Sequence, residues 1–344
     1  MPVIKRATSL DVAKKAGVSR TTVSFVLNKV PGVSISEVTR KRVLKVAHKL
    51  NYHPNEAGLR LASGKSRTIG LVLCQSPEQV FADALLPQVI LGVEQAAIQQ
   101  GFHVLLKAVE PKDAVGYTRL IRENHVDGIL LSGPRRDDQE IIRLHQEGVP
   151  IMLMGQLPDT DIPFADVDAT AGAVLAVNHL IEFGHRRIAI ITNAPLSYTS
   201  ARQRRAGYLK ALKQANLKAE KTLTKEGAYT PASGFEAMTA LLNMSRRQRP
   251  TAVFVASDVV AIGAMLAITR AGLRIPRDIA LVGFDDIPLA EYFDPPLTTI
   301  HLPAYGLGWA AGERLIRLIR GEGLDQPCLL MDSELIIRAS TKKS

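Results

Sequence analysis

The hydrophobic positions along this chain of 344 residues follow two different patterns. Over residues 9–28 and 37–50, apolar side chains recur three and four positions apart, which predicts short amphipathic helices around one shared core. From residue 68 onward, short and nearly continuous apolar runs alternate with longer amphipathic stretches. This alternation predicts parallel β-sheets covered by helices on both faces. The expected fold class is therefore an all-α head followed by an α/β body.

The strand–helix alternation restarts near residue 167, which predicts two similar doubly wound lobes rather than one large sheet. A segment of about two helical turns over residues 54–64 precedes them, and isolated helices shorter than ~12 residues are marginal in water. We expect this segment to be helical only when docked, and so to act as a switch. The expected organisation is a helix-turn-helix head over 1–53, a hinge helix and linker over 54–67, a first lobe over 68–166 and a second lobe over 167–301. The late segments about 302–324 and about 325–340 could cross back to the first and the second lobe respectively, although the sequence does not prove these crossings.

The stretch SLDVAKKAGVSRTTVSFVLN, residues 9–28, predicts two helices joined by a tight turn. Ala13 is small enough for two helices to cross closely, Gly17 can take the left-handed conformation that ends the first helix, and Val23 points back at it. Ser19 lies where an N-cap is expected, so the second helix begins at Arg20. In a helix-turn-helix, such a second helix lies in the DNA major groove. The alternative from this pattern alone is an ordinary helical hairpin.

The charge distribution favours the DNA-binding interpretation. Residues 1–67 carry 14 Lys and Arg against three acidic residues, although the whole chain has a net charge of only +10. A positively charged head on a nearly neutral body is typical of a protein that binds a polyanion. A solvated basic tail would lack the helical periodicity seen here.

Taken together, these segments resemble the LacI/GalR family of bacterial transcription regulators over essentially the whole chain. The matching stretches are DVAKKAGVSRTTVSFVLN, VTRKRVLKVAHKLNYHPN, SRTIGLVL, VDATAGAVLAVNHLIEFGHRRIAII, SARQRRAGYLKAL and ALVGFDDIPLAEYFDPPLTTI. The resemblance implies a DNA-binding head, a hinge helix and a two-lobed body like the type I periplasmic binding proteins. It also implies a small effector between the lobes and a homodimer on double-stranded operator DNA.

Residues that contact DNA are carried over from the resemblance by position. Leu61 is expected in the minor groove as an apolar wedge that kinks the operator centre. Arg20, Thr21 and Phe25 match base-reading positions, although Arg20 could equally contact a phosphate. Phe25 replaces a polar residue, which suggests contact with a thymine methyl group. The remaining positions are expected to contact phosphates or to shape turns, and they are Thr8, Ser19, Thr22 and Asn28.

Candidate effector residues follow the apolar strands, because ligands of doubly wound sheets bind outside the carboxyl ends of the strands. The residues at these positions are Ser132, Asp168, Ser257, Asp258 and Asp285, of which Asp258 could be only a helix cap. The resemblance implies an effector-binding role for Asp285 and Arg202, with an interlobe salt bridge as the alternative for Arg202. It also places Tyr229 against the ligand and Phe81 among the first-lobe apolar contacts. Ser257 replaces a common asparagine, so a sugar or polyol is expected with a purine or nucleoside as the alternative.

Other classes of protein are disfavoured by what the sequence contains. Cys74 and Cys328 lie in apolar strand-like runs, which favours buried free thiols. No apolar run is long enough to cross a membrane, and no signal-peptide pattern precedes the head, so we expect a cytoplasmic protein without a membrane partner. Phosphate-loop and nucleophile-elbow motifs are absent and histidines are scattered, so we expect no enzyme activity, catalytic residue, metal or cofactor.

The expected function is that of a sequence-specific transcriptional regulator, and we expect it to repress transcription. We expect it to bind a pseudo-palindromic operator as a dimer. A tetramer is not expected, because the sequence shows no C-terminal leucine heptad repeat. Whether the effector releases DNA or promotes binding stays open. The alternative function is that of a periplasmic-type sugar-binding protein without a transcriptional role.

Overall fold

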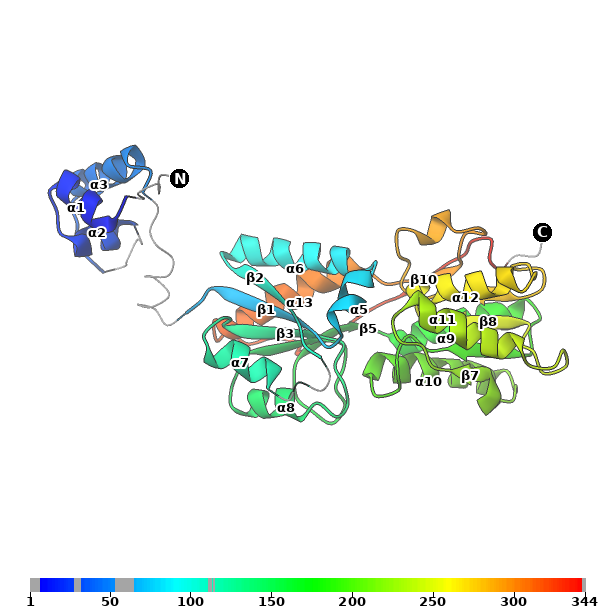
Figure 1. Ribbon diagram of the computed structural model, residues 1–344. Coiled ribbons are helices and arrows are strands. Elements are labelled where there is room, and N and C mark those ends of the chain that lie inside the picture. Colours follow the sequence, from blue (N-terminus) through cyan, green and yellow to red (C-terminus); the bar gives the residue numbers. More distant parts are fainter. Residues whose placement is uncertain (1–6, 28–31, 53–64, 111–112, 114, 342–344) are drawn as a thin grey trace. The chain divides into compact units, whose positions relative to one another are not determined.

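The computed structural model describes residues 7–27, 32–52, 65–110, 113 and 115–341, in two compact units. The first unit is the head, Met1–Ser66, and the second is the body, Arg67–Ser344 (Figure 1). Each unit has its own hydrophobic core. The expected hinge helix over 54–67, with Leu61, lies almost wholly outside the described residues, and so does Asn28.

Within the described residues of the head, three helices share one core through their apolar stripes. They are α1 (Ser9–Ala16), α2 (Arg20–Leu27) and α3 (Glu37–Lys49). Gly17 ends α1 in the left-handed conformation with φ of 62°, which confirms the reason for a glycine there. Val23, 1% exposed, packs in the core with Ala13, as the helix-turn-helix pattern predicts.

The first lobe of the body is a parallel sheet of six strands in the order β11-β5-β4-β3-β1-β2. Helices α6 and α13 cover one face, and α7 and α8 cover the other (Figure 1). The elements are β1 (Thr68–Leu73), α5 (Pro77–Ala82), α6 (Leu86–Gln100), β2 (His103–Ala108), α7 (Gly116–Arg122), β3 (Gly128–Ser132), α8 (Gln139–Gln146), β4 (Ile151–Met154), β5 (Phe164–Val167), α13 (Ala304–Ile319) and β11 (Cys328–Met331).

The second lobe repeats this architecture around a parallel sheet of four strands, β7-β6-β8-β9. Successive strand residues alternate between the two helix layers: Ile190 and Phe254 pack toward α9 and α10, whereas Ile191 and Val255 pack toward α11 and α12. Both faces are therefore buried, as the apolar runs predict. The elements are α9 (Ala169–Glu182), β6 (Ile188–Ile191), α10 (Thr199–Gln214), η1 (Lys221–Leu223), β7 (Thr224–Lys225), α11 (Pro231–Leu242), β8 (Ala252–Val255), α12 (Asp258–Arg270), β9 (Ala280–Val282), η2 (Ala290–Tyr292), β10 (Thr299–His301) and β12 (Glu334–Ile336).

The chain crosses between the lobes three times: after β5, after β10 and after β11. The third crossing differs from the expected boundary near residue 325, because β11 pairs in parallel with β5 in the first-lobe sheet. The first lobe therefore extends to Met331, and β12 then pairs with β10 beside the second lobe. Local sequence could not show which sheet accepts a late apolar strand.

Both cysteines are free, but only one is buried. Cys74 follows β1 in the interior, as expected, whereas Cys328 is exposed and corrects the expectation of a second buried thiol. The reason is that Cys328 begins β11, which is the edge strand of its sheet. Within the part of the chain that the structure describes, no helix is long and apolar enough to cross a membrane.

Candidate functional site

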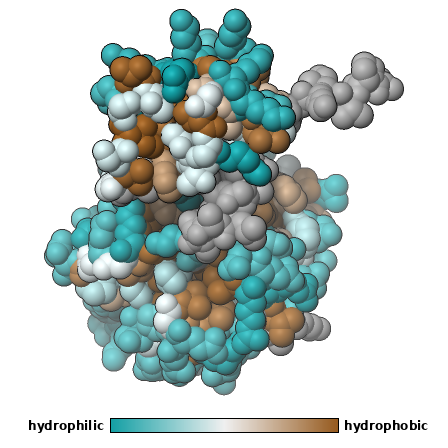
Figure 2. Space-filling view, turned by 90° about the vertical axis from the view of Figure 1, so that its left-hand side faces the viewer, coloured by the Kyte–Doolittle hydropathy of each residue, from teal (hydrophilic) through white to brown (hydrophobic). Residues whose placement is uncertain are grey.

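The surface of the head around α2 carries the residues predicted to contact DNA. Arg20 and Thr21 are exposed at the start of α2, and Phe25 is half-buried one turn further on. The Arg20 Nε donates to Ser9 Oγ at 3.3 Å, which links the start of α2 to the start of α1. Hydrophilic residues project from the visible face of the head, with hydrophobic residues in patches between them (Figure 2).

Two of the predicted DNA-contacting residues, Thr8 and Ser19, also cap helices. The side chain of Thr8 forms a capping box with Asp11 at the start of α1, and Ser19 Oγ accepts from Thr22 N at 3.0 Å at the start of α2. Ser19 and Thr22 are also joined through their hydroxyls at 2.9 Å. These caps fix the starts of α1 and α2, and the N-terminal end of a helix favours an anion such as a phosphate.

In the body, a buried ion pair lies where the two lobes meet. Arg204 from α10 is 7% exposed, and its Nη1 lies 3.1 Å from Asp285 Oδ1, in the loop after β9. The same nitrogen donates to the carbonyl oxygen of Ala256 at 2.6 Å. The guanidinium carbon also lies 3.8 Å from the centroid of the Phe284 ring, so the cation is stabilised by the face of an aromatic side chain. Arg204 is therefore rigidly positioned.

Two carboxylates of the first lobe approach this ion pair. Burial raises the pKa of Asp83, between α5 and α6, against the lowering effects of the Leu85 and Leu86 N–H groups and of Arg204. Burial likewise raises the pKa of Asp166, in β5, to about 6, with Arg204 again among the groups that lower it. We call Asp83, Asp166, Arg204 and Asp285 the interlobe cluster, because two members come from each lobe.

Asp285 forms the direct ion pair with Arg204, and its pKa is raised as well. Burial raises its pKa to about 6, and the negative charge of Asp83 adds to that rise. Arg204 and a hydrogen bond with Ser257 act in the opposite direction. A carboxylate so desolvated gains from any ligand that donates hydrogen bonds to it.

Neutral polar groups lie next to the interlobe cluster. Tyr229 packs edge-on against Tyr198, with ring centroids 5.4 Å apart, and its hydroxyl lies 3.5 Å from Ser200 Oγ. Ser200 also accepts from Asn193 Nδ2 at 3.2 Å. In the described part of the chain, Asn193 Oδ1 and Arg204 Nε are buried side-chain atoms without a hydrogen-bond partner. Buried polar atoms are nearly always satisfied, so both atoms indicate a place for a polar ligand.

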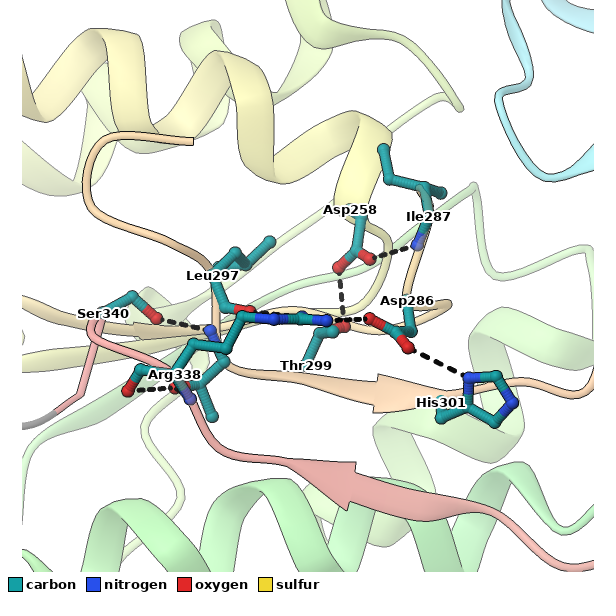
Figure 3. A network of polar contacts seen from close by, with 9 residues as sticks. Asp258, Asp286, Ile287, Leu297, Thr299, His301, Arg338 and Ser340 are labelled. Atoms are coloured by element: carbon teal, nitrogen blue, oxygen red, sulfur yellow. Dashed lines mark hydrogen bonds and ion pairs between the residues drawn. The ribbon is translucent and has the colours of Figure 1, made fainter. Parts of the chain in front are cut away.

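The loop that carries Asp285 is held by a second polar network (Figure 3). Asp258 is fully buried, and its carboxylate accepts from the Thr299 hydroxyl at 2.7 Å and from the Ile287 N–H at 3.0 Å. Asp286 accepts from Arg338 at 2.8 Å and lies 3.0 Å from His301 Nδ1.

This network stabilises an unusual backbone. Asp285 has φ of 119° and Asp286 has φ of 56°, a region that side chains other than glycine rarely adopt. Such strain persists only where the surroundings over-determine it, and it is concentrated at functional sites. The contacts of Asp258 and Asp286 therefore hold the Asp285 carboxylate against Arg204.

The structure brings some of the predicted effector residues together and leaves others apart. Asp285, Ser257 and Tyr229 lie at or beside the interlobe cluster. Asp258 is instead engaged by the protein itself, and Asp168 caps α9 through the N–H of Ala171 at 2.8 Å. The remaining predicted positions are Ser132, half-buried at the end of β3, and Phe81, 80% exposed in α5.

The structure places Arg204, and not the predicted Arg202, at the interlobe cluster. Arg202 is exposed, whereas Arg204 lies on the buried face of α10 with Ala201, Tyr208 and Ala211. Residues two positions apart on a helix point in nearly opposite directions, so only one of the two can reach Asp285. The spacing from Ala201 to Tyr208 was a helical signal that could have identified Arg204. Asp83, Asp166 and Asn193 had no such local signal.

Direct hydrogen bonds join the lobes beside this site. The Tyr198 hydroxyl donates to the carbonyl oxygen of Cys74 at 2.7 Å, and Thr199 Oγ1 donates to that of Pro134 at 3.2 Å. On the other side, Gln79 Nε2 donates to the carbonyl oxygen of Ala228 at 3.0 Å. The two lobes are therefore in contact around the interlobe cluster.

Comparison with known proteins identifies both parts of the chain. Residues 8–55 match the model of bacterial regulatory proteins of the lacI family, and residues 177–341 match a periplasmic binding protein-like domain. The HTH-type transcriptional repressor PurR of Haemophilus influenzae (strain PittEE) is 35% identical over 343 residues, which cover 98% of this chain and 99% of that protein. The HTH-type transcriptional regulator CelR of Thermobifida fusca is 34% identical over 343 residues, with 98% of each chain covered.

Solved structures agree over both units. A lac repressor dimer bound to operator and the anti-inducer ONPF superposes with a TM-score of 0.85 at 33% identity, covering 98% of this chain and 99% of that one. A CelR–cellobiose complex superposes with a TM-score of 0.75 at 33% identity, covering 97% of this chain and 100% of that one. The chain therefore belongs to the LacI family of bacterial regulatory proteins, and it is a DNA-binding transcriptional regulator.

Proposed function

We propose that this protein is a repressor that binds a pseudo-palindromic operator as a homodimer in the cytoplasm, and that a polyol held between its lobes controls this binding. The observation that carries the proposal is the coexistence of a basic helix-turn-helix head and a desolvated interlobe cluster in one chain. A binding protein without a transcriptional role would have no use for the head.

The head supports operator binding through α2. Arg20 and Thr21 are exposed where a recognition helix presents its first residues to base edges, and the capped N-terminal ends of α1 and α2 favour phosphate contacts. Phe25, half-buried, keeps an apolar edge available for a thymine methyl group. We assign base contacts to these three residues, and backbone contacts to Thr8, Ser19 and Thr22.

The interlobe cluster supports recognition of a hydroxylated effector. Carboxylates accept hydrogen bonds and a guanidinium donates them, so together they match hydroxyl groups, which do both. We assign effector contacts to Arg204, Asp285, Ser257 and Tyr229, and a supporting structural role to Asp258. The relative CelR was solved as a cellobiose complex, which is consistent with a sugar for this protein.

Dimerisation has a physical basis in apolar side chains exposed on both lobes. Leu91 and Ile98 of α6 are 52% and 59% exposed, and Leu266, Leu289 and Tyr292 of the second lobe are 46%, 54% and 76% exposed. Large exposed apolar patches mark protein–protein interaction sites, and these side chains are candidates for such a patch. A twofold dimer would present two heads to two operator half-sites.

The test is selection of duplexes from a random library by the full-length protein, followed by binding measurements with Arg20→Ala. We expect enrichment of a twofold-symmetric site, with a loss of about 1–3 kcal/mol in Arg20→Ala that is confined to particular base pairs. Lys49→Ala, at the exposed end of α3, is the matched control and should weaken all duplexes alike. A wild-type protein that enriches no symmetric sequence would contradict the proposal.

A further inference from the structure

The interlobe cluster contains more acidic groups than basic ones. Asp83 and Asp166 approach from the first lobe and Asp285 from the second, and Arg204 is the cation that acts on all three carboxylates. Arg204, Asp166 and Asp285 are each at most 8% exposed. Since water is largely excluded, these charges act on a ligand with little screening.

This imbalance restricts the charge of the ligand. A phosphate or carboxylate placed among three carboxylates meets like charges at short range, and only one guanidinium compensates. Like-charge juxtaposition in a binding site costs affinity strongly, whereas a hydroxyl group donates to the same oxygens. The cluster therefore favours an uncharged donor of hydrogen bonds over an anion.

The unsatisfied atoms indicate the same kind of ligand. Asn193, 2% exposed, has a buried Oδ1 without a partner, and Arg204 has a buried Nε without one, among the residues that the structure describes. The first atom requires a donor and the second an acceptor. A hydroxyl group is both, so a polyol can satisfy the two atoms as well as the carboxylates.

Asp83 differs from the other two carboxylates in how its charge is compensated. Asp285 is paired directly with Arg204 at 3.1 Å, and Asp166 accepts from Gln156 Nε2 at 3.0 Å and from the Val167 N–H at 2.8 Å. Asp83 accepts from the backbone N–H of Leu85 at 2.8 Å and is less deeply buried than Asp166. Asp83 is therefore the least enclosed of the three acidic residues.

We infer that the effector is an unphosphorylated, non-acidic polyol, and that Asp83 is the residue that excludes the phosphorylated and carboxylated forms. This inference rests on the proposed function and adds the charge class of the effector. The regulator would then respond to a free sugar before a phosphoryl-transfer reaction consumes it.

The test uses matched triplets of ligands on the full-length protein, followed by thermal shift and calorimetry. Each triplet contains a free sugar, its phosphate and its acid, such as glucose, glucose 6-phosphate and glucuronate, repeated for galactose, mannose and ribose. We expect the binding members to be free sugars, with their anionic partners about 100-fold weaker or more. Asp83→Asn should narrow that ratio about tenfold, since the amide keeps an acceptor for Leu85 but loses the charge.

Two controls separate a charge effect from damage to the fold. Asp161→Asn removes a carboxylate whose side chain is 93% exposed in the same lobe, and it should leave the ratio unchanged. Asp83→Ser should narrow the ratio as Asp83→Asn does. An anion that binds as tightly as its free sugar, or a ratio unaffected by both Asp83 variants, would overturn the inference while the proposed function stands. Binding by no polyol at all would instead contradict the effector class of the proposed function, and the inference with it.

Discussion

At the scale of single residues, Arg204 determines much of the chemistry of the interlobe site. One guanidinium joins Asp285, the carbonyl oxygen of Ala256 and the face of Phe284, so its position is determined from three directions. Removing one partner of a buried charge pair costs about 3–5 kcal/mol, because the other charge is left without compensation. A conservative change therefore tests its role better than a deletion.

Arg204→Lys and Arg202→Lys form a matched pair two residues apart in α10. We expect Arg204→Lys to weaken effector binding by about 10- to 100-fold, because an ammonium cannot reproduce the planar fork of donors. Arg202→Lys, at an exposed position, should bind the effector like the wild type. Calorimetric titration of both variants measures the difference, and equal affinities would contradict the assignment of Arg204.

Asp166 allows a test of pH dependence. Burial raises its pKa to about 6, above the usual 3.8, so the folded protein holds this proton more tightly than the unfolded chain does. Its contribution to stability is therefore most favourable below pH 4, falls as pH rises from about 4 to 6, and stays low above. Asp166→Asn removes this dependence. The free energy of unfolding of the variant, relative to that of the wild type, should therefore rise by about 3 kcal/mol as the pH increases from about 4 to 6.

Urea unfolding of the wild type and Asp166→Asn at pH 4, 5, 6 and 7 provides the measurement. The amide retains an acceptor for the N–H of Val167, so the local fold should persist. Parallel stability curves over this range would mean that Asp166 is not desolvated in solution.

At the scale of elements, close helix packing shapes the second lobe. Helices α11 and α12 approach so closely that a Cβ on Gly263 would lie 1.7 Å from the carbonyl oxygen of Pro231. A Cβ on Gly234, from the opposite helix, would lie 1.9 Å from the carbonyl oxygen of Val260. Glycines on both helices thus permit backbone contact beside Ser257 and Asp258, at the start of α12.

Gly263→Ala should therefore destabilise the protein, by about 3 kcal/mol or more, since the helices must separate to accept a methyl group. Gly306→Ala in α13 is the control, because a Cβ there meets no atom within 4 Å. That substitution should stabilise the protein by about 0.5–1 kcal/mol through helix propensity. Urea denaturation of both variants measures the change in the free energy of unfolding, which should be negative for Gly263→Ala and positive for Gly306→Ala. Similar changes in the two variants would contradict the packing argument.

At the scale of the whole body, the two lobes are joined by three crossings and by direct hydrogen bonds. Tyr198 and Thr199, at the start of α10, donate to carbonyl oxygens of the first lobe, and Tyr198 packs against Tyr229 of the proposed effector site. A ligand that prefers this arrangement shifts the population of lobe conformations toward it. The strength of these bonds therefore influences how the effector acts.

Tyr198→Phe removes the hydroxyl that donates to the carbonyl oxygen of Cys74 and otherwise keeps the ring. One net hydrogen bond is worth about 0.5–1.5 kcal/mol. The lobe arrangement seen in the structure should therefore become about two- to tenfold less populated relative to the open one, and the affinity for the effector should fall by a similar factor. Tyr208→Phe removes a comparable bond, to the carbonyl oxygen of Ile188 within the second lobe, and should leave effector affinity unchanged. In X-ray scattering without ligand, the radius of gyration should increase only for Tyr198→Phe. An unchanged radius would contradict the role of the Tyr198–Cys74 hydrogen bond in holding the lobes together.

The sequence by itself determined the features that depend on neighbouring residues. Helical spacing and the left-handed glycine at Gly17 specify the head, and apolar runs specify strands buried on both faces of a sheet. Caps such as Ser19 and Ser36 lie where the local pattern predicts them, because a cap acts on N–H groups only a few residues away.

Only the tertiary structure decided which distant residues meet. Asp83, Asp166 and Asp285 converge on Arg204 because the chain crosses between the lobes, and no local period encodes that convergence. The same crossings assigned β11 to the first lobe and left Cys328 on an exposed edge. The contacts of Asp258 with Thr299 and Ile287 likewise join residues that are far apart in the sequence. Desolvation and ion pairing depend on distance in space rather than along the chain, so the chemistry of this site became visible only in the folded protein.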